Sequence, residues 1–126
     1  MSSTTTAPAV QVFLPIPPSV NNLFHNVPGK GRVKSRAYLA WECEARYLVQ
    51  WPRLTEDRTN RIRWEAEYVL HNLPNNRDVS NCLKAAEDFL CTMTGLRDAY
   101  CRRIVLARED GGTPGLALTV WLQEEG

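Results

Sequence analysis

The sequence has few histidines, no closely paired cysteines and no long apolar segment. It contains two histidines, far apart, and four cysteines, none of them spaced as Cys-x-x-Cys. This pattern argues against a zinc site, which is built from closely spaced Cys and His ligands. No apolar run approaches the ~20 residues of a membrane-spanning helix, and residues 1–9 lack the apolar core of a signal peptide. We therefore expect reduced thiols in a cytoplasmic protein with no membrane partner.

The net charge is only +1, but the charges are unevenly distributed. Residues 30–64 hold nine Lys or Arg and four acids, whereas residues 65–126 hold six Lys or Arg and ten acids. A basic half beside an acidic half favours a polyanionic partner together with a carboxylate site. A mixed, solvated surface is the alternative interpretation. With 126 residues, 44% of them apolar, the chain can bury a core of its own.

The apolar patterns predict a small α/β (α+β) fold with one sheet of about four strands and two helices, in the order β-α-β-α-β-β. We expect residues 1–9 to be a disordered tail and residues 10–126 to form a single domain. The expected strands cover residues 10–14, 62–70, 101–107 and 116–122. Residues 25–34 are expected to form a flexible basic loop, and residues 109–115 a hairpin loop. In the second strand, the polar face is expected to carry Arg61, Arg63, Glu65 and Glu67.

Two helices are predicted from apolar residues at helical spacing. Ser35 can cap a helix that runs to about Gln50. The second helix is expected to begin with Asp78 or Ser80 as its N-cap and to end at Gly95. Its expected core face consists of Val79, Leu83, Ala86, Leu90 and Met93.

The second helix and its flanks gather an unusual set of charged residues. Asp78 precedes the helix, Lys84 lies within it, and Asp98 follows it before the next strand. Carboxylates at one edge can bind Mg²⁺, which keeps several waters and accepts phosphate oxygens, and a lysine can hold the phosphate. Structural explanations exist for each residue. Asp78 can be a helix cap, Asp98 a turn former, and Lys84 an exposed partner of Asp88 in an ion pair worth ~0.3–0.5 kcal/mol.

Three blocks of the sequence are similar to the RusA family of Holliday junction resolvases, small phage and prophage-type endonucleases. The first, Pro17-Pro18-Ser19-Val20-Asn21, is like the Pro-Pro-Ser-x-Asn of that family. The second runs from Arg77 to Lys84 and continues through Asp88-Phe89-Leu90, like Arg-Asp-x-Asp-Asn-x-x-Lys followed by Asp-x-Leu. The third, Arg97-Asp98-Ala99, is like Asp-Asp-Ala. The resemblance covers residues 14–121.

The resemblance implies a RusA-like nuclease that acts as a homodimer and cuts four-way DNA junctions by paired symmetric nicks, in recombination and repair. It implies dependence on Mg²⁺ or Mn²⁺, and a phage or prophage protein in the cytoplasm of a bacterial host. The implied catalytic residues are Asp78, Lys84 and Asp98, with Asp78 and Asp98 as metal ligands and Asn81 as a positioning residue. Candidate DNA phosphate contacts are Lys30, Arg32, Lys34, Arg36 and Arg77.

The chain departs from the family pattern at two positions, because Ser80 replaces the second aspartate and Arg97 replaces the first of the paired aspartates. Ser80 remains a candidate ligand, but a hydroxyl binds a hard cation more weakly than a carboxylate does. Glu87 or Asp88 could compensate only from two helical turns away. Three hypotheses follow: an active resolvase, a junction-binding protein that cuts weakly or not at all, and a structural domain whose acids are only caps and ion pairs.

Overall fold

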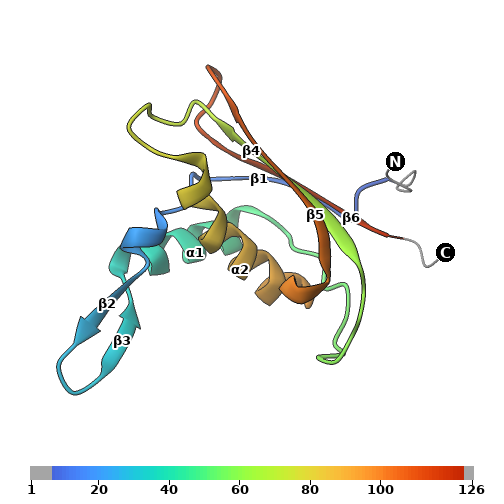
Figure 1. Ribbon diagram of the computed structural model, residues 1–126, viewed down its shortest axis with the longest axis horizontal. Coiled ribbons are helices and arrows are strands. Elements are labelled where there is room, and N and C mark those ends of the chain that lie inside the picture. Colours follow the sequence, from blue (N-terminus) through green and yellow to red (C-terminus); the bar gives the residue numbers. More distant parts are fainter. Residues whose placement is uncertain (1–6, 124–126) are drawn as a thin grey trace.

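A computed structural model describes residues 7–123 and has a mixed α+β fold (Figure 1). The helix expected from residue 36 to about residue 50 is present as one α-helix. The helix expected at residues 79–94 is present as a 3₁₀ turn followed by a second α-helix. The six strands are Val10–Leu14 (β1), Phe24–Val27 (β2), Gly31–Lys34 (β3), Trp64–His71 (β4), Cys101–Glu109 (β5) and Gly115–Leu122 (β6). The helices are Arg36–Leu48 (α1) and Leu83–Thr94 (α2), and short 3₁₀ turns cover Val20–Asn22 (η1), Val79–Cys82 (η2) and Asp98–Tyr100 (η3).

The main sheet has four strands in the order β1-β6-β4-β5, so the expected number of strands is confirmed. β6 pairs antiparallel with both β1 and β4, whereas β5 runs parallel to β4 after the α2 crossover. The prediction of a hairpin at residues 109–115 was wrong, because β4 lies between β5 and β6. The Gly- and Pro-rich loop reverses the chain across the end of β4, where the Asn72 amide donates to the Glu109 carbonyl at 2.8 Å.

The tail expected at residues 1–9 falls mostly outside the described residues, which begin at residue 7. Ala9 is described, and its amide donates to the carbonyl oxygen of Val120 at 2.7 Å. This bond continues the β1–β6 ladder by one residue. In the described residues, no helix is long and apolar enough to cross a membrane.

Both helices cover the same face of the main sheet (Figure 1). Every second residue of β4 and β6 faces them, and these residues are almost wholly buried: Trp64, Ala66, Tyr68, Leu70, Leu116, Leu118 and Val120. From α2, Phe89 packs edge-on against Trp41 and Trp51, each with ring centroids 5.4 Å apart. The opposite face of the sheet is not covered by any helix in the described part of the chain. On that face Glu65 is 6% exposed, so its expected solvent-facing position was wrong.

The ends of the helices follow the sequence only in part. Ser35 caps α1 as predicted, with its hydroxyl accepting from the Tyr38 amide at 3.1 Å, and α1 ends at Leu48. Gly95 ends α2 as predicted, at φ 87°, with its amide donating to Cys91. The prediction of a side-chain cap by Asp78 or Ser80 was wrong. A 3₁₀ turn precedes α2, and the Asp78 side chain makes no capping hydrogen bond.

The buried face of the second helix differs from the predicted one by a rotation about the helix axis. The fully buried residues of α2 are Ala85, Ala86, Phe89, Leu90 and Thr94. Val79, Leu83 and Met93 are only partly buried. One side of α2 packs against the sheet, and Phe89 on the neighbouring side packs against α1. The buried surface of the helix is therefore wider than the single apolar face that was predicted.

Residues 25–34 are not the expected flexible loop but most of a two-stranded hairpin formed by β2 and β3. Gly29 and Gly31 adopt φ 80° and 76°, which glycine accommodates without a steric penalty. This hairpin, called the hairpin arm below (residues 24–34), projects away from the body of the molecule (Figure 1).

Candidate functional site

The first two motif blocks, far apart in the sequence, meet at one polar pocket. The pocket has a volume of about 290 Å³. It is lined by Ser19, Asn21, Asn22, Asn76, Arg77, Asp78 and Asn81. All of these side chains are polar, and amide groups predominate. The pocket therefore offers hydrogen-bond donors and acceptors beside one carboxylate.

Arg77 holds this junction of the two blocks together. Its Nη2 donates to the Pro17 carbonyl oxygen at 2.8 Å and contacts the Cys82 sulfur at 3.3 Å. The Arg108 guanidinium in turn donates to the Arg77 carbonyl oxygen. Burial raises the pKa of the Cys82 thiol, although Arg77 and Arg108 oppose this shift. The guanidinium predicted to contact DNA thus makes contacts within the protein.

Asp78, Ser80 and Asn81 surround the 3₁₀ turn before α2. Asp78 and Ser80 are exposed, and Asn81 is partly buried. The Asp78 main-chain carbonyl accepts from the Asn81 amide at 3.1 Å, while the Asp78 carboxylate makes no hydrogen bond or ion pair in the described residues. This carboxylate remains open to a ligand in the pocket.

Lys84 begins a charged face of α2, called here the acidic face, formed by Lys84, Glu87, Asp88 and Cys91. Their spacing of three and four residues places them together along the helix. The Lys84 ammonium lies 3.2 Å from the Asp88 carboxylate, and both side chains are exposed to solvent. The ion pair named as the structural explanation for Lys84 is therefore present, and its expected stabilisation is small.

Asp98 lies beyond the end of α2 and influences Glu87. The pKa of Glu87 is raised by burial, then by the negative charges of Asp98 and Asp88, and is lowered by Lys84. The motif blocks specify no residue at position 87, so Glu87 entered the sequence analysis only as a possible replacement for the missing aspartate. Its position three residues after Lys84, on the same face of the helix, was the available signal.

The two aspartates that the resemblance assigns to one metal ion lie on either side of α2 in the sequence. Asp78 precedes this helix of twelve residues, and Asp98 follows it. No group of three His, Cys, Asp or Glu side chains within residues 7–123 is arranged to hold a metal ion. The grouping of Asp78, Ser80 and Asp98 around one ion stays a prediction.

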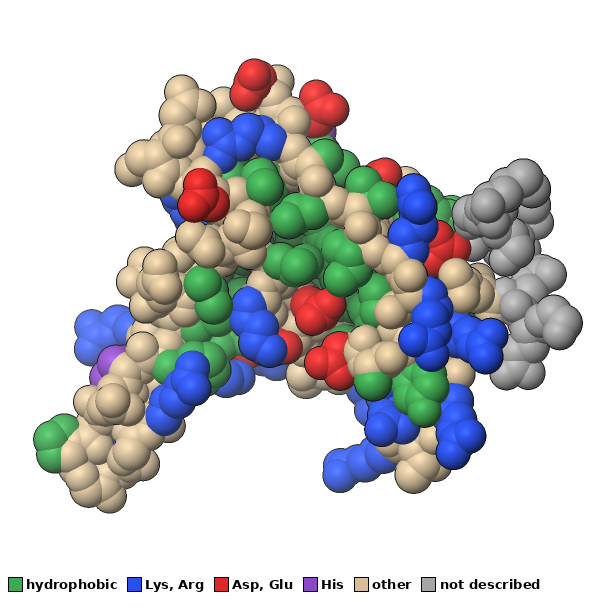
Figure 2. Space-filling view, viewed as in Figure 1, with side chains coloured by type: hydrophobic (Ala, Val, Ile, Leu, Met, Phe, Trp, Pro, Cys, Tyr) green, Lys and Arg blue, Asp and Glu red, His purple; other side chains and the backbone are tan. Residues whose placement is uncertain are grey.

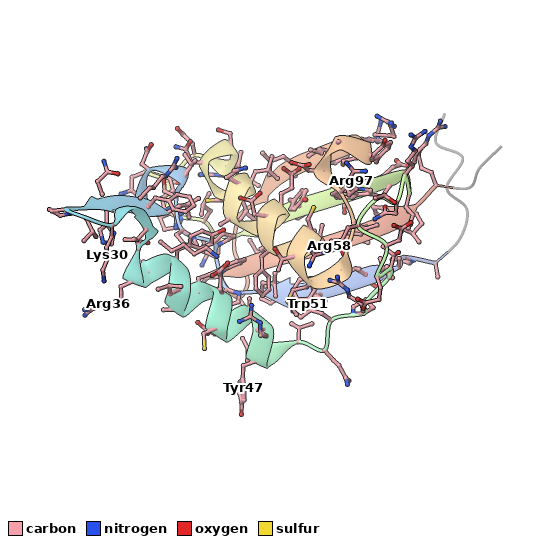
Figure 3. All side chains as sticks on the ribbon, turned by 90° about the horizontal axis from the view of Figure 1, so that it is seen from below. Lys30, Arg36, Tyr47, Trp51, Arg58 and Arg97 are labelled. Atoms are coloured by element: carbon pink, nitrogen blue, oxygen red, sulfur yellow. The ribbon has the colours of Figure 1, made fainter. Side chains whose placement is uncertain are left out.

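The predicted basic residues 30–36 lie on the hairpin arm and the start of α1. Lys30 is at the exposed tip, and the Arg32 guanidinium lies 4.2 Å from the centroid of the Phe24 ring. Lys34 forms an ion pair with Glu42 at 3.0 Å, and Arg36 is exposed. Figure 3 shows Lys30 and Arg36 at the same end of the molecule. The arm carries Lys30, Arg32 and Lys34 and no acidic residue of its own, and Lys34 is the one of these three that forms an ion pair with another described residue.

A second basic surface, which the sequence analysis did not single out, lies around the end of α2. The guanidiniums of Arg97 and Arg102 lie 5.3 and 5.4 Å from the Tyr100 ring centroid. Arg97 also lines a pocket of about 230 Å³ with Arg53 and Arg58. We call these four arginines the arginine surface. They come from two separate segments, residues 53–58 and 97–102, which the fold brings together.

Comparison with known families does not identify the chain. No protein-family model matches it, and no curated protein matches it.

Proposed function

We propose that this chain is a structure-specific endonuclease that binds four-way DNA junctions and cuts them by paired symmetric nicks, acting in recombination and repair. One observation carries the proposal. Carboxylates gather on the acidic face of α2, and basic residues lie on either side of them, on the hairpin arm and on the arginine surface. Figure 2 shows Asp and Glu side chains between two groups of Lys and Arg on one face of the molecule.

This arrangement suits a branched polyanion. Lys30 and Arg36 on one side, and Arg58 and Arg97 on the other, can neutralise phosphates on separate duplex arms. Phosphate contacts of this kind position DNA without reading its sequence. The amide-rich pocket beside Asp78 adds hydrogen-bonding groups next to the hairpin arm. A cytoplasmic protein of phage or prophage origin belongs to the same proposal.

A homodimer is also part of the proposal, since two symmetric nicks require two sites. The uncovered face of the main sheet is a suitable contact surface. Val69, Val105 and Trp121 lie on it by register, together with Phe13, which is 46% exposed. Phe13 packs near His71 with ring centroids 6.0 Å apart. Apolar side chains in one layer are what an isologous sheet-to-sheet contact would bury.

Mg²⁺ or Mn²⁺ is the cofactor implied by the resemblance, with Asp78, Asp98 and Ser80 as its candidate ligands. Asp78 precedes α2 and Asp98 follows it. Ser80 offers a hydroxyl, which binds a hard cation more weakly than a carboxylate does. We derive no step through a metal held by these three residues.

A junction-binding protein with weak or lost cleavage is the second candidate, and the hydroxyl of Ser80 in place of a carboxylate favours it. Both basic surfaces would serve such a protein unchanged. Binding and cutting must therefore be measured separately.

The test uses a synthetic four-way junction and a linear duplex of the same sequence, with Mg²⁺ or Mn²⁺. An endonuclease should bind the junction more tightly than the duplex and nick two opposing strands, and Asp98→Asn should lose nicking while keeping binding. Junction binding by a folded dimer with no nicking at any metal concentration would favour the second candidate. Equal, salt-insensitive affinity for both DNAs would contradict both.

A further inference from the structure

We propose that the hairpin arm enters the major groove of duplex DNA, where Asn26 and Arg32 contact base edges and give the protein a sequence preference. This inference deepens the proposed endonuclease function and rests on its DNA-binding part. It assigns base recognition to one face of the arm, in addition to the phosphate contacts expected from the basic residues.

The arm has a shape that the major groove admits. β2 and β3 form a two-stranded sheet of their own, which projects from the body of the molecule (Figure 1). Each strand has four residues, which span about 13 Å, whereas the major groove of B-DNA is about 8.5 Å deep and about 12 Å wide. A two-stranded ribbon fits this groove, but the minor groove is only about 6 Å wide. The arm is therefore long enough and narrow enough to reach base edges.

The root of the arm is fixed to the body of the molecule. The Ser35 hydroxyl donates to the Asn22 carbonyl oxygen at 2.6 Å, and the Ser35 amide donates to the Leu23 carbonyl oxygen at 2.8 Å. The Phe24 ring packs edge-on against the buried ring of Tyr38, with centroids 5.8 Å apart. These contacts hold both strands at the root, so the direction of the arm is set before DNA binds. Such preorganisation lowers the entropic cost of binding.

Asn26 and Arg32 lie directly opposite one another in the pairing of β2 with β3. Opposite residues of an antiparallel pair share a face of the ribbon, and their Cβ atoms are about 4.5–5.5 Å apart. This separation is similar to the rise of about 3.4 Å between successive nucleotides of one DNA strand. Both side chains are exposed, and neither makes a hydrogen bond or an ion pair with a residue that the structure describes. The two side chains can therefore contact neighbouring base pairs.

Arg32 is oriented for such a contact. Its guanidinium lies 4.2 Å from the centroid of the Phe24 ring, which is itself held against Tyr38. Stacking uses the face of the guanidinium and leaves the N–H groups at its edge free to donate. Lys34 differs, because its ammonium is paired with Glu42 at 3.0 Å. The stacking restricts the Arg32 side chain without neutralising its charge.

The chemistry of this pair selects the bases. An arginine guanidinium donates two hydrogen bonds to O6 and N7 of guanine, and an asparagine amide forms two with N6 and N7 of adenine. The other face of the ribbon carries His25 opposite Val33, which do not form such a pair of bidentate groups. We therefore expect a preference for guanine at one base pair and adenine at a neighbouring one.

The test uses a four-way junction in which one arm is randomised, without divalent metal, and the whole chain selects the sequences that it binds. Sequencing of the bound fraction should show guanine and adenine enriched by about five- to 150-fold at two neighbouring positions. Arg32→Lys keeps the charge but should abolish the guanine enrichment, and Asn26→Ala should abolish the adenine enrichment. His25→Ala, on the other face of the ribbon, is the matched control and should keep both. Circular dichroism confirms that each variant is folded.

A duplex RNA competitor distinguishes groove entry from phosphate contacts, because side chains cannot read the narrow major groove of A-form RNA. RNA of the selected sequence should compete no better than RNA of any other sequence. Junction binding without enrichment, or an enrichment that survives both Arg32→Lys and Asn26→Ala, would overturn the inference and leave the endonuclease proposal standing. No binding to any DNA would contradict both. Enrichment that depends on these two residues, with no nicking once Mg²⁺ is added, would support the inference and count against the endonuclease proposal.

Discussion

The guanidinium of Arg77 donates a hydrogen bond to the carbonyl oxygen of Pro17, sixty positions earlier in the chain, at 2.8 Å. This bond joins the proline-rich segment after β1 to the segment that leads into α2. The Arg77 side chain therefore helps to fix the relative position of the two motif blocks at the polar pocket. Its predicted contact with DNA stays a prediction.

Arg77→Met should therefore destabilise the protein by about 1–3 kcal/mol, because the Pro17 carbonyl loses a charge-assisted donor. Urea denaturation followed by circular dichroism measures the change. Arg36→Met is the control, since Arg36 is exposed and its replacement should change stability by no more than about 0.5 kcal/mol. Equal effects at the two positions would show that the internal contacts of Arg77 contribute nothing.

Asp78→Ala should change the free energy of unfolding by no more than about 0.5 kcal/mol. The Asp78 side chain makes no capping hydrogen bond, so nothing of that kind is lost. A helix cap would cost about 1 kcal/mol when removed. Thermal and urea unfolding of the two proteins distinguish these values, and a loss near the larger one would mean that Asp78 caps the helix in solution.

Gly95→Ala should be strongly destabilising. Gly95 adopts φ 87°, and an added Cβ would lie 2.3 Å from the carbonyl oxygen of Thr55. Gly112→Ala is the matched control, because it has φ 78° and open space around it. The control should cost about 1–2 kcal/mol for the left-handed backbone alone. Urea denaturation measures the loss of stability in each variant, and the larger loss expected for Gly95→Ala reflects the clash with Thr55. Equal losses in the two variants would contradict the observed packing.

Junction affinity should fall steeply with salt, and Lys30→Ala should reduce the slope of log K against log [salt] by about 0.9. Lys30 lies at the exposed tip of the hairpin arm, where a phosphate contact would release one counterion. Lys30→Arg keeps the charge and should keep the slope. Fluorescence anisotropy over a salt series gives these slopes, and an unchanged slope in Lys30→Ala would place the DNA elsewhere.

Thiol reactivity should be confined to Cys43 at neutral pH. Cys43 is exposed, whereas burial raises the pKa of Cys82 and Cys101 and raises that of Cys91 to about 12. Only the thiolate reacts, so these three thiols stay protonated and slow until the pH approaches their pKa. Timed alkylation with mass spectrometry should show one fast site, and Cys43→Ser should abolish it. Fast modification of Cys91 would contradict its raised pKa and its partly buried position.

The sequence predicted those features of the fold that depend on only a few neighbouring residues. Ser35 and Gly95 mark helix ends through their own backbone preferences, and the alternation at Trp64, Ala66 and Tyr68 marks the helix-facing side of β4. The strand order could not be predicted in this way. The loop at residues 109–115 indicates that the chain reverses, but it does not indicate that β6 pairs with β4 instead of β5.

The candidate site shows the same limit. Motif order gives the sequence positions of Asp78 and Asp98 on either side of α2 but carries no distance between them. The arginine surface arises only when separate segments pack together. Glu87 was visible in the sequence, but its proximity to Asp98 depends on the path of the chain after Gly95.

The central position of β6 affects how the chain can fold during synthesis. β6 pairs with both β1 and β4, yet it is made after every other element of the sheet. While residues 115–122 are still inside the ribosome, β1 has no partner and β4 presents a bare edge. The four-stranded sheet can therefore be completed only at the end of synthesis. A chain stalled before Gly115 would expose the unpaired backbone groups of β1 and β4, which could pair with strands of neighbouring nascent chains.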